Sequence, residues 1–169
     1  MSTASAHADT PPGVQLREAQ PADVARILGH IRALGDYERL AHEVVATEAQ
    51  LAATLFGERR YAEVVLADYQ GQPAGFALFF HNYSTFLGKP GIYLEDLFVE
   101  PAMREHGVGG ALLRHLARLA VARGCGRLEW SALDWNRLAI DFYLGLGAVA
   151  MDEWTTFRLT GAELQRLAR

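Results

Sequence analysis

The sequence contains very little cysteine: Cys125 is the only one in 169 residues. A single thiol excludes an intrachain disulfide and a zinc site built from several cysteines. The six histidines are scattered without metal-ligand spacing, so we expect no bound metal. Because no histidine motif accompanies Cys125, we interpret it as a structural residue and not as a nucleophile.

Long apolar runs and an excess of basic residues are also missing. No stretch approaches the roughly 20 apolar residues of a membrane span, so we expect no membrane association. The net charge is −4, and a nucleic-acid partner would require a concentrated basic surface. Residues 1–13 lack the basic start and apolar stretch of a signal peptide. We therefore expect a disordered tail over residues 1–13 and a cytoplasmic protein.

Half of the residues are hydrophobic, which is enough for a single domain with its own core over residues 14–169. The first half of this domain alternates between strand and helix patterns. A strand is predicted at 14–19, and apolar residues at helical spacing predict a helix over 21–34. Thr47 is the predicted N-cap of a short helix ending at residue 55. Two β-rich segments, 61–67 and 74–80, flank a Gln-Gly-Gln-Pro turn and predict a hairpin.

The second half predicts a strand over 92–99, followed by a long amphipathic helix. The further predicted elements are a helix over 108–123, a strand over 127–133, a helix over 136–144, strands over 148–151 and 155–159, and a short helix over 160–167. The full order is βααβββαβαββ, which is an α+β fold with a mixed, mostly antiparallel sheet. One parallel crossover is expected through the helix 108–123.

A glycine-bearing loop separates the strand 92–99 from this helix. It reads Arg104-Glu105-His106-Gly107-Val108-Gly109-Gly110. Glycine lets backbone amides approach a ligand closely, and the start of a helix offers free N–H groups and the positive end of its dipole. The loop therefore favours a phosphate-bearing ligand. It lacks the Gly-Lys-Ser/Thr ending of a Walker loop and the Gly-x-Gly-x-x-Gly dinucleotide pattern.

Two acidic residues, Glu95 and Asp96, interrupt the apolar strand before this loop. Alternation along a strand predicts that their side chains point to opposite faces, so we do not expect them to act together on one atom. Carboxylates in so apolar a strand are costly without partners. At least one of them is expected to have a structural or catalytic role.

These features resemble the GNAT superfamily of acetyl-CoA-dependent N-acetyltransferases over about residues 14 to 160. Three stretches are similar to the spermidine/spermine (diamine) acetyltransferase group: residues 93–99, Asp134-Trp135-Asn136, and Phe142-Tyr143 with Gly147-Ala148. Residues 84–88 and 133–136 are more similar to the thialysine acetyltransferase branch. The polyamine-preferring branch has an acidic residue where Ser84 stands, which argues against spermidine and spermine themselves.

The resemblance implies acetyl-CoA as co-substrate, a small-molecule amine as acceptor, and a homodimer. It implies coenzyme contacts at Leu97, Phe98, Val99, Arg104, Glu105, His106, Gly107, Val108, Gly109, Gly110, Asn136 and Tyr143. It also implies an acceptor side formed by Tyr37, Glu38, Glu95, Asp96 and Trp154. Glu95 would be the base and Tyr143 the acid that protonates the leaving thiolate. Asp96 is left as substrate-binding or structural, and an N-cap role explains Asn136 equally well.

Three functions remain open from the sequence. The leading one is transfer of acetyl from acetyl-CoA to a small primary amine, such as a thialysine-like amino acid, a diamine or a polyamine. The second uses the same machinery on a protein lysine or an amino-sugar drug. The third is a catalytically idle acetyl-CoA sensor, and the presence of both Glu95 and Tyr143 argues against it.

Overall fold

The computed structural model describes residues 10–169, so most of the predicted disordered tail lies outside the described residues. The chain divides into two compact units, Met1–Ser131 and Ala132–Arg169. Each unit is described by itself, and the single domain expected over residues 14–169 stays a prediction.

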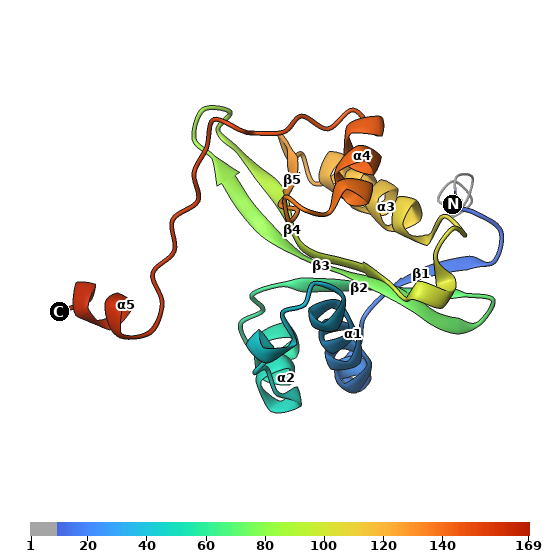
Figure 1. Ribbon diagram of the computed structural model, residues 1–169, viewed down its shortest axis with the longest axis horizontal. Helices are drawn as coiled ribbons and strands as arrows, with labels where there is room; N and C mark the ends of the chain where they lie inside the picture. The colour runs from blue at the N-terminus through green and yellow to red at the C-terminus, as the bar shows by residue number, and fades with distance from the viewer. Residues whose placement is uncertain (1–9) are drawn as a thin grey trace. The chain divides into compact units, whose positions relative to one another are not determined.

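The first unit is built on one five-stranded sheet in the order β1-β2-β3-β4-β5 (Figure 1). Its strands are β1 (Val14–Glu18), β2 (Glu63–Tyr69), β3 (Gln72–Ser84), β4 (Lys89–Val99) and β5 (Leu128–Trp130). The first four strands pair antiparallel, and β5 pairs parallel with β4. The predicted mixed, mostly antiparallel α+β sheet is therefore confirmed. The parallel crossover runs through α3 (Val108–Ala122), as predicted.

The hairpin between β2 and β3 follows from two residues that accept positive φ. Gln70 and Gly71 have φ of 49° and 78°, the backbone that a tight two-residue hairpin turn requires. Tyr69 then pairs with Gln72. β3 and β4 form a second hairpin and extend beyond the predicted strands 74–80 and 92–99, because they stay paired as far as Ser84 and Lys89.

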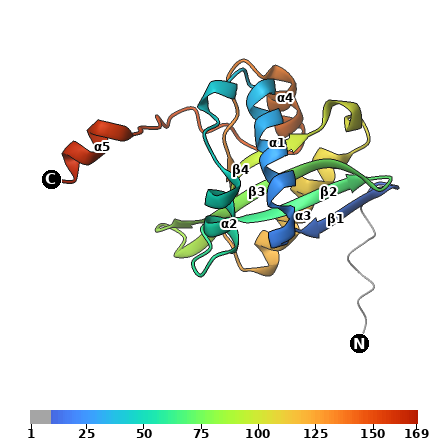
Figure 2. The same cartoon turned by 90° about the horizontal axis from the view of Figure 1, so that it is seen from below.

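Helices cover both faces of the sheet in this unit. The 3₁₀ turn η1 (Pro21–Asp23) leads into α1 (Val24–Tyr37), and η2 (Ala41–Glu43) leads to α2 (Glu48–Phe56). Both α-helices pack on one face, and α3 packs on the other (Figures 1 and 2). Thr47 caps α2 as predicted, accepting a hydrogen bond from the Gln50 amide at 3.2 Å.

The core under α1 and α2 is apolar and fully enclosed. It contains Val24, Ile27, Leu28, Leu34, Leu51, Leu55, Val64, Leu66, Phe76 and Phe98. Burial of this set stabilises the fold by about 25 cal/mol for each Å² removed from water. The same packing fixes α1 against β3 and β4, which is what positions the site below.

The second unit contains α4 (Arg137–Gly145) and α5 (Gly161–Leu167). Between them, residues 146–160 form no strand, although two strands were predicted at 148–151 and 155–159. Extended segments are held by ladder hydrogen bonds to neighbouring strands, and within this unit no strand accompanies them. Of the helices that the structure describes over residues 10–169, none has the length and apolar character needed to cross a bilayer.

Candidate active site

The glycine loop lies where β4 ends and α3 begins. Glu100 follows β4 and donates its amide to the carbonyl of Ala74 at 2.8 Å. The 3₁₀ turn η3 (Pro101–Met103) then redirects the chain, and α3 begins after Gly107. The first-turn amides of a helix have no partner within the helix. This turn of α3 has neither an acidic residue nor a side-chain cap, so its amides suit an anion.

The glycines of the loop serve two different purposes. Gly107 has φ +78°, and a Cβ there would approach Pro11 Cγ to 2.8 Å, so the fold itself requires glycine. Gly109 has no such requirement, because a Cβ there would lie at an ordinary 3.6 Å from Val99 Cγ2. Glycine at position 109 instead leaves the backbone accessible from outside, which fits a ligand diphosphate.

The larger side chains of the loop are held by the protein. Arg104 donates from Nε to the carbonyl of Val99 at 3.2 Å, and its guanidinium lies over the ring of Tyr37. The ring of His106 stacks on Tyr69, with 4.3 Å between centroids. Glu105 has φ +67°, so it contributes to the bend of the chain. The loop therefore offers backbone groups as its anion-binding surface.

β4 carries the remaining predicted coenzyme positions, Leu97, Phe98 and Val99. Its pairing with β5 ends at Leu94 and Trp130, whereas β4 continues to Val99 along β3. Beyond Leu94, β5 no longer runs beside β4, so it does not pair with the backbone N–H and C=O groups of β4 that point away from β3. Phe98 is 3 % exposed, so its side chain belongs to the core and only its backbone can face a ligand.

A bulge in β4 changes the placement of the two carboxylates. Leu78 pairs with Asp96 and Phe79 pairs with Leu94, which leaves Glu95 without an opposite residue. Strict alternation therefore fails here, and the predicted opposite orientation of Glu95 and Asp96 does not follow from the register. Bulges of this kind re-aim side chains and are common beside active sites. Asp96 shares the face of Leu78 and Phe98, which is the face covered by α1 and α2.

Three carboxylates act on one another at this position. Burial, together with the nearby negative charges of Glu95 and Glu38, raises the pKa of Asp96 to about 6. Burial also raises the pKa of Glu38, which is the C-cap of α1. Such a group lowers its energy when a cation binds beside it. The predicted acceptor residues Tyr37, Glu38, Glu95 and Asp96 thus come from the end of α1 and the bulge of β4.

The other predicted residues belong to the unit Ala132–Arg169. Asn136 is the N-cap of α4 and accepts a hydrogen bond from the Ala139 amide at 3.3 Å. Tyr143 lies in α4, with its ring centroid 5.6 Å from that of Phe142. Trp154 lies in the segment between α4 and α5. The roles of these three residues in the site stay predictions.

Sequence reasoning did not identify one polar pair next to the loop, formed by a buried histidine and a partly exposed glutamate. His30 of α1 is 4 % exposed, and its Nδ1 lies 2.9 Å from Glu100 Oε1. The available signal was a histidine on the apolar stripe of α1, three residues after Ile27 and four before Leu34. Among residues 10–169, no group of three or more His, Cys, Asp or Glu side chains is placed to hold a metal ion.

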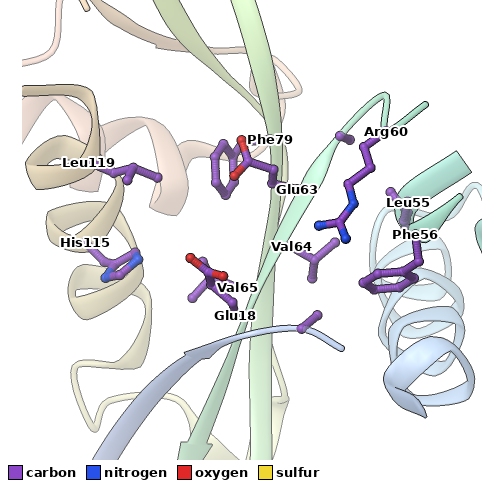
Figure 3. Close-up of a pocket in the computed structure, with 12 residues that line it drawn as sticks. Glu18, Leu55, Phe56, Arg60, Glu63, Val64, Val65, Phe79, His115 and Leu119 are labelled. Atoms are coloured by element: carbon purple, nitrogen blue, oxygen red, sulfur yellow. The ribbon is translucent and has the colours of Figure 1, made fainter. Parts of the chain in front are cut away.

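A separate small cavity lies at the opposite end of the strands, where β1 ends and β2 begins (Figure 3). It encloses about 50 Å³ between Glu18, Glu63, His115 and apolar neighbours. Arg123 pairs with Glu63 at 2.7 Å there. The cavity reaches β3 at Phe79, which pairs with Glu63, whereas Val99 pairs with Gly75 further along β3.

Comparison with known proteins gives a consistent pattern. The acetyltransferase (GNAT) family matches residues 26–148. A thialysine N-epsilon-acetyltransferase from Bos taurus is 36 % identical over 92 % of this chain and 97 % of its own length. An L-ornithine N5-acetyltransferase from Arabidopsis thaliana is 35 % identical over 90 % of this chain and 87 % of its own length.

Solved structures agree at the level of the fold. An integron cassette protein from V. cholerae has a TM-score of 0.78 at 28 % identity, and the match covers 93 % of this chain and 98 % of that one. An aminoglycoside acetyltransferase from an uncultured soil metagenomic sample has a TM-score of 0.74 at 18 % identity, covering 88 % of this chain and 96 % of that one.

Proposed function

Because this chain belongs to the acetyltransferase (GNAT) family, we propose that it transfers the acetyl group of acetyl-CoA to a primary amine of a small molecule. The acceptor class is a thialysine-like amino acid, a diamine or a polyamine. Two relatives named for acetylating small amines, thialysine and L-ornithine, support this class over a protein lysine. A homodimer and a cytoplasmic location, both implied by the family resemblance, belong to the same proposal.

One observation carries the proposal: the strand whose bulge holds Glu95 and Asp96 leads, through η3, to the glycine turn at Gly107–Gly110, whose first-turn amides suit an anion. The amides from Arg104 to Gly110 bind the diphosphate of the coenzyme, with the dipole of α3 stabilising its charge. The backbone of Leu97 and Val99 binds the pantetheine arm and the thioester carbonyl.

The acceptor amine arrives as an ammonium ion, since its pKa is near that of lysine, about 10.4. Glu38 and Asp96 attract the ammonium, and its charge offsets the mutual repulsion of the carboxylates. Glu95 removes a proton from it, directly or through a water. The neutral amine nitrogen then attacks the thioester carbon.

Attack forms a C–N bond and a tetrahedral intermediate whose oxyanion requires fixed donors, supplied here by backbone N–H groups of β4. When the intermediate collapses, the C–S bond breaks and the thiolate of CoA leaves. Tyr143 donates its phenolic proton to that thiolate, and the proton that the attacking nitrogen loses as the amide forms restores the phenol. A phenol with a pKa near 10 matches this task only with good geometry, because the thiol formed has a pKa near 8.5.

A thiol-release assay across an amine panel tests the proposal. The panel contains thialysine, ornithine, a short diamine, spermidine, an aminoglycoside and a lysine-containing peptide. We expect the highest kcat/KM with a small amino acid or diamine. Turnover confined to the peptide or the aminoglycoside would transfer the assignment to that acceptor. Binding of acetyl-CoA without thiol release from any amine would establish the sensor function instead. Light scattering in the same buffer tests the homodimer.

A further inference from the structure

We propose that His30 is a positioning residue for coenzyme binding, which acts by holding Glu100 at the start of the diphosphate loop. The inference rests on the proposed function only in taking CoA as the ligand of that loop. His30 itself lies in α1, under the sheet, and is 4 % exposed. Its ring stacks on Phe76 of β3 at 5.5 Å between centroids. It therefore acts through Glu100 and not by contact with the ligand.

The partners of the imidazole define its hydrogen bonds. Arg26 is only a donor, and its Nε points to His30 Nε2 at 3.4 Å. The ring proton is therefore on Nδ1, where it is donated to Glu100 Oε1 at 2.9 Å. Burial lowers the pKa of His30, which favours this neutral form. A hydrogen bond to a charged acceptor is about twice as strong as one between neutral groups.

Arg26, the second hydrogen-bond partner of His30, is itself held by β2. Arg26 donates to the carbonyl of Ala67 at 2.8 Å. Its guanidinium also lies 2.8 Å from Asp68 Oδ1, without hydrogen-bond geometry at that oxygen, so this contact is electrostatic. α1 is thus fixed to β2 on one side and to Glu100 on the other.

The same helix contacts the other end of the turn. Tyr37 follows His30 by two helical turns, which places both residues on one face of α1. The ring of Tyr37 lies under the guanidinium of Arg104 at 4.5 Å. Glu100 and Arg104 bracket η3, so α1 holds both ends of the bend that delivers the chain to Gly107. The bend is thereby set before the coenzyme arrives, and the cost of ordering it does not reduce affinity.

Two variants at His30 separate donation from packing. His30→Asn places an amide nitrogen near the position of Nδ1 and retains a donor for Glu100, whereas His30→Leu removes it. Without that donor the bend has to be ordered when CoA binds, which reduces affinity, so we expect His30→Leu to weaken CoA binding by about 10-fold. We expect His30→Asn to recover most of that loss. His115→Leu removes a histidine of α3 that lines the separate cavity beside Glu18 and Glu63; it is the control and should bind CoA as the wild type does.

Glu100 provides a second pair that avoids substitution in the core, since its side chain is 33 % exposed. Glu100→Gln retains an acceptor for Nδ1–H, and Glu100→Ala does not. We expect the Kd for CoA of Glu100→Ala to equal that of His30→Leu, and the Kd of Glu100→Gln to equal that of His30→Asn. This pair decides the proposal if His30→Leu fails to fold.

The ligand supplies the readout that a merely structural role would not change. Calorimetry gives the Kd for CoA, and turnover with S-acetylpantetheine reports a thioester that has no diphosphate. His30→Leu and Glu100→Ala should lose affinity for CoA while keeping the wild-type kcat/KM with S-acetylpantetheine. The proposal would be overturned if His30→Leu and Glu100→Ala bound CoA as tightly as the wild type, or if His30→Asn and Glu100→Gln lost as much CoA affinity as they do. It would also be overturned if kcat/KM with S-acetylpantetheine fell as much as the affinity for CoA. If the wild type acetylates no amine, the proposed function fails, and the CoA titrations still decide the role of His30. If the wild type does not bind CoA, both proposals are overturned.

Discussion

The guanidinium of Arg104 lies 4.5 Å from the centre of the Tyr37 ring. Arg104 belongs to the turn before α3, and Tyr37 is the last residue of α1. Glu38, the next residue, is one of the carboxylates that act on Asp96. A cation–π contact thus joins the turn before α3 to the helix that carries Glu38. Partly exposed contacts of this kind contribute about 0.5–1 kcal/mol.

Gly109→Ala should separate stability from coenzyme affinity. A Cβ at this position meets only Val99 Cγ2, at 3.6 Å, so replacing a helical glycine should stabilise the fold by about 0.5–1 kcal/mol. The same Cβ stands where the diphosphate approaches the amides. Loss of one amide–anion contact costs about 1.5–3 kcal/mol, so we expect acetyl-CoA binding to weaken by about 10-fold or more.

Gly29→Ala is the control for that experiment, because a Cβ at Gly29 of α1 has nothing within 4 Å. It should stabilise the protein by a similar amount and leave the Kd for acetyl-CoA unchanged. Thermal unfolding and calorimetric titration measure both quantities. An unchanged Kd for acetyl-CoA in Gly109→Ala would show that the diphosphate does not bind at this turn.

Tyr143→Phe tests the proposed acid. Removing a general acid lowers turnover by about 10²–10⁴-fold, so kcat should fall by that amount while the Kd for acetyl-CoA stays as in the wild type. Tyr61→Phe, at an exposed tyrosine before β2, is the control. Equal losses of turnover and affinity in Tyr143→Phe would show a binding role instead.

Glu95 and Asp96 should give different kinetic effects. Glu95→Gln removes the proposed base and should lower kcat by about 10²-fold or more. Asp96→Asn should mainly raise the KM for the amine, because it removes a negative charge beside the ammonium. Since the pKa of Asp96 is about 6, the ratio of wild-type to Asp96→Asn kcat/KM should fall as the pH drops through 6. Taking the ratio cancels the ionisation of the amine itself, and a ratio that is flat with pH would contradict this role.

Asp96 should also affect stability in a pH-dependent way. Its pKa is raised from 3.8 in the unfolded chain to about 6 in the folded protein, so the folded state holds this proton more tightly. The resulting stability is present below pH 3.8 and is lost as the pH rises through 6. The Asp96→Asn variant has no carboxyl group at this position, so its stability does not decrease for this reason as the pH rises. Relative to the wild type, its free energy of unfolding should therefore increase by about 1–3 kcal/mol between pH 4 and pH 7. Urea unfolding at both pH values measures it, and a constant difference between the two proteins would contradict the assignment.

The sequence was most informative where local chemistry determines the backbone. The positive-φ turn at Gln70 and Gly71, the capping of α2 by Thr47 and the glycine loop before α3 all follow from residue types at fixed positions. Helix α1 runs three residues beyond the predicted Leu34, to Tyr37, whose ring contacts the guanidinium of Arg104.

Features that depend on neighbouring chain segments were not predictable in the same way. The bulge at Glu95 exists only in the register between β3 and β4, so alternation along β4 alone does not determine the relation between Glu95 and Asp96. The contact of His30 with Glu100 spans 70 positions and has no local signature. For residues 148–159, an apolar pattern predicted strands, but a strand also requires a partner, which the sequence pattern does not supply.

A crystal structure of the protein with CoA tests the central claim most directly. The account predicts diphosphate oxygens within hydrogen-bonding distance, about 2.7–3.2 Å, of backbone nitrogens between Gly107 and Gly110, with the pantetheine arm running along Leu97 and Val99. A diphosphate bound anywhere else on the protein would contradict it.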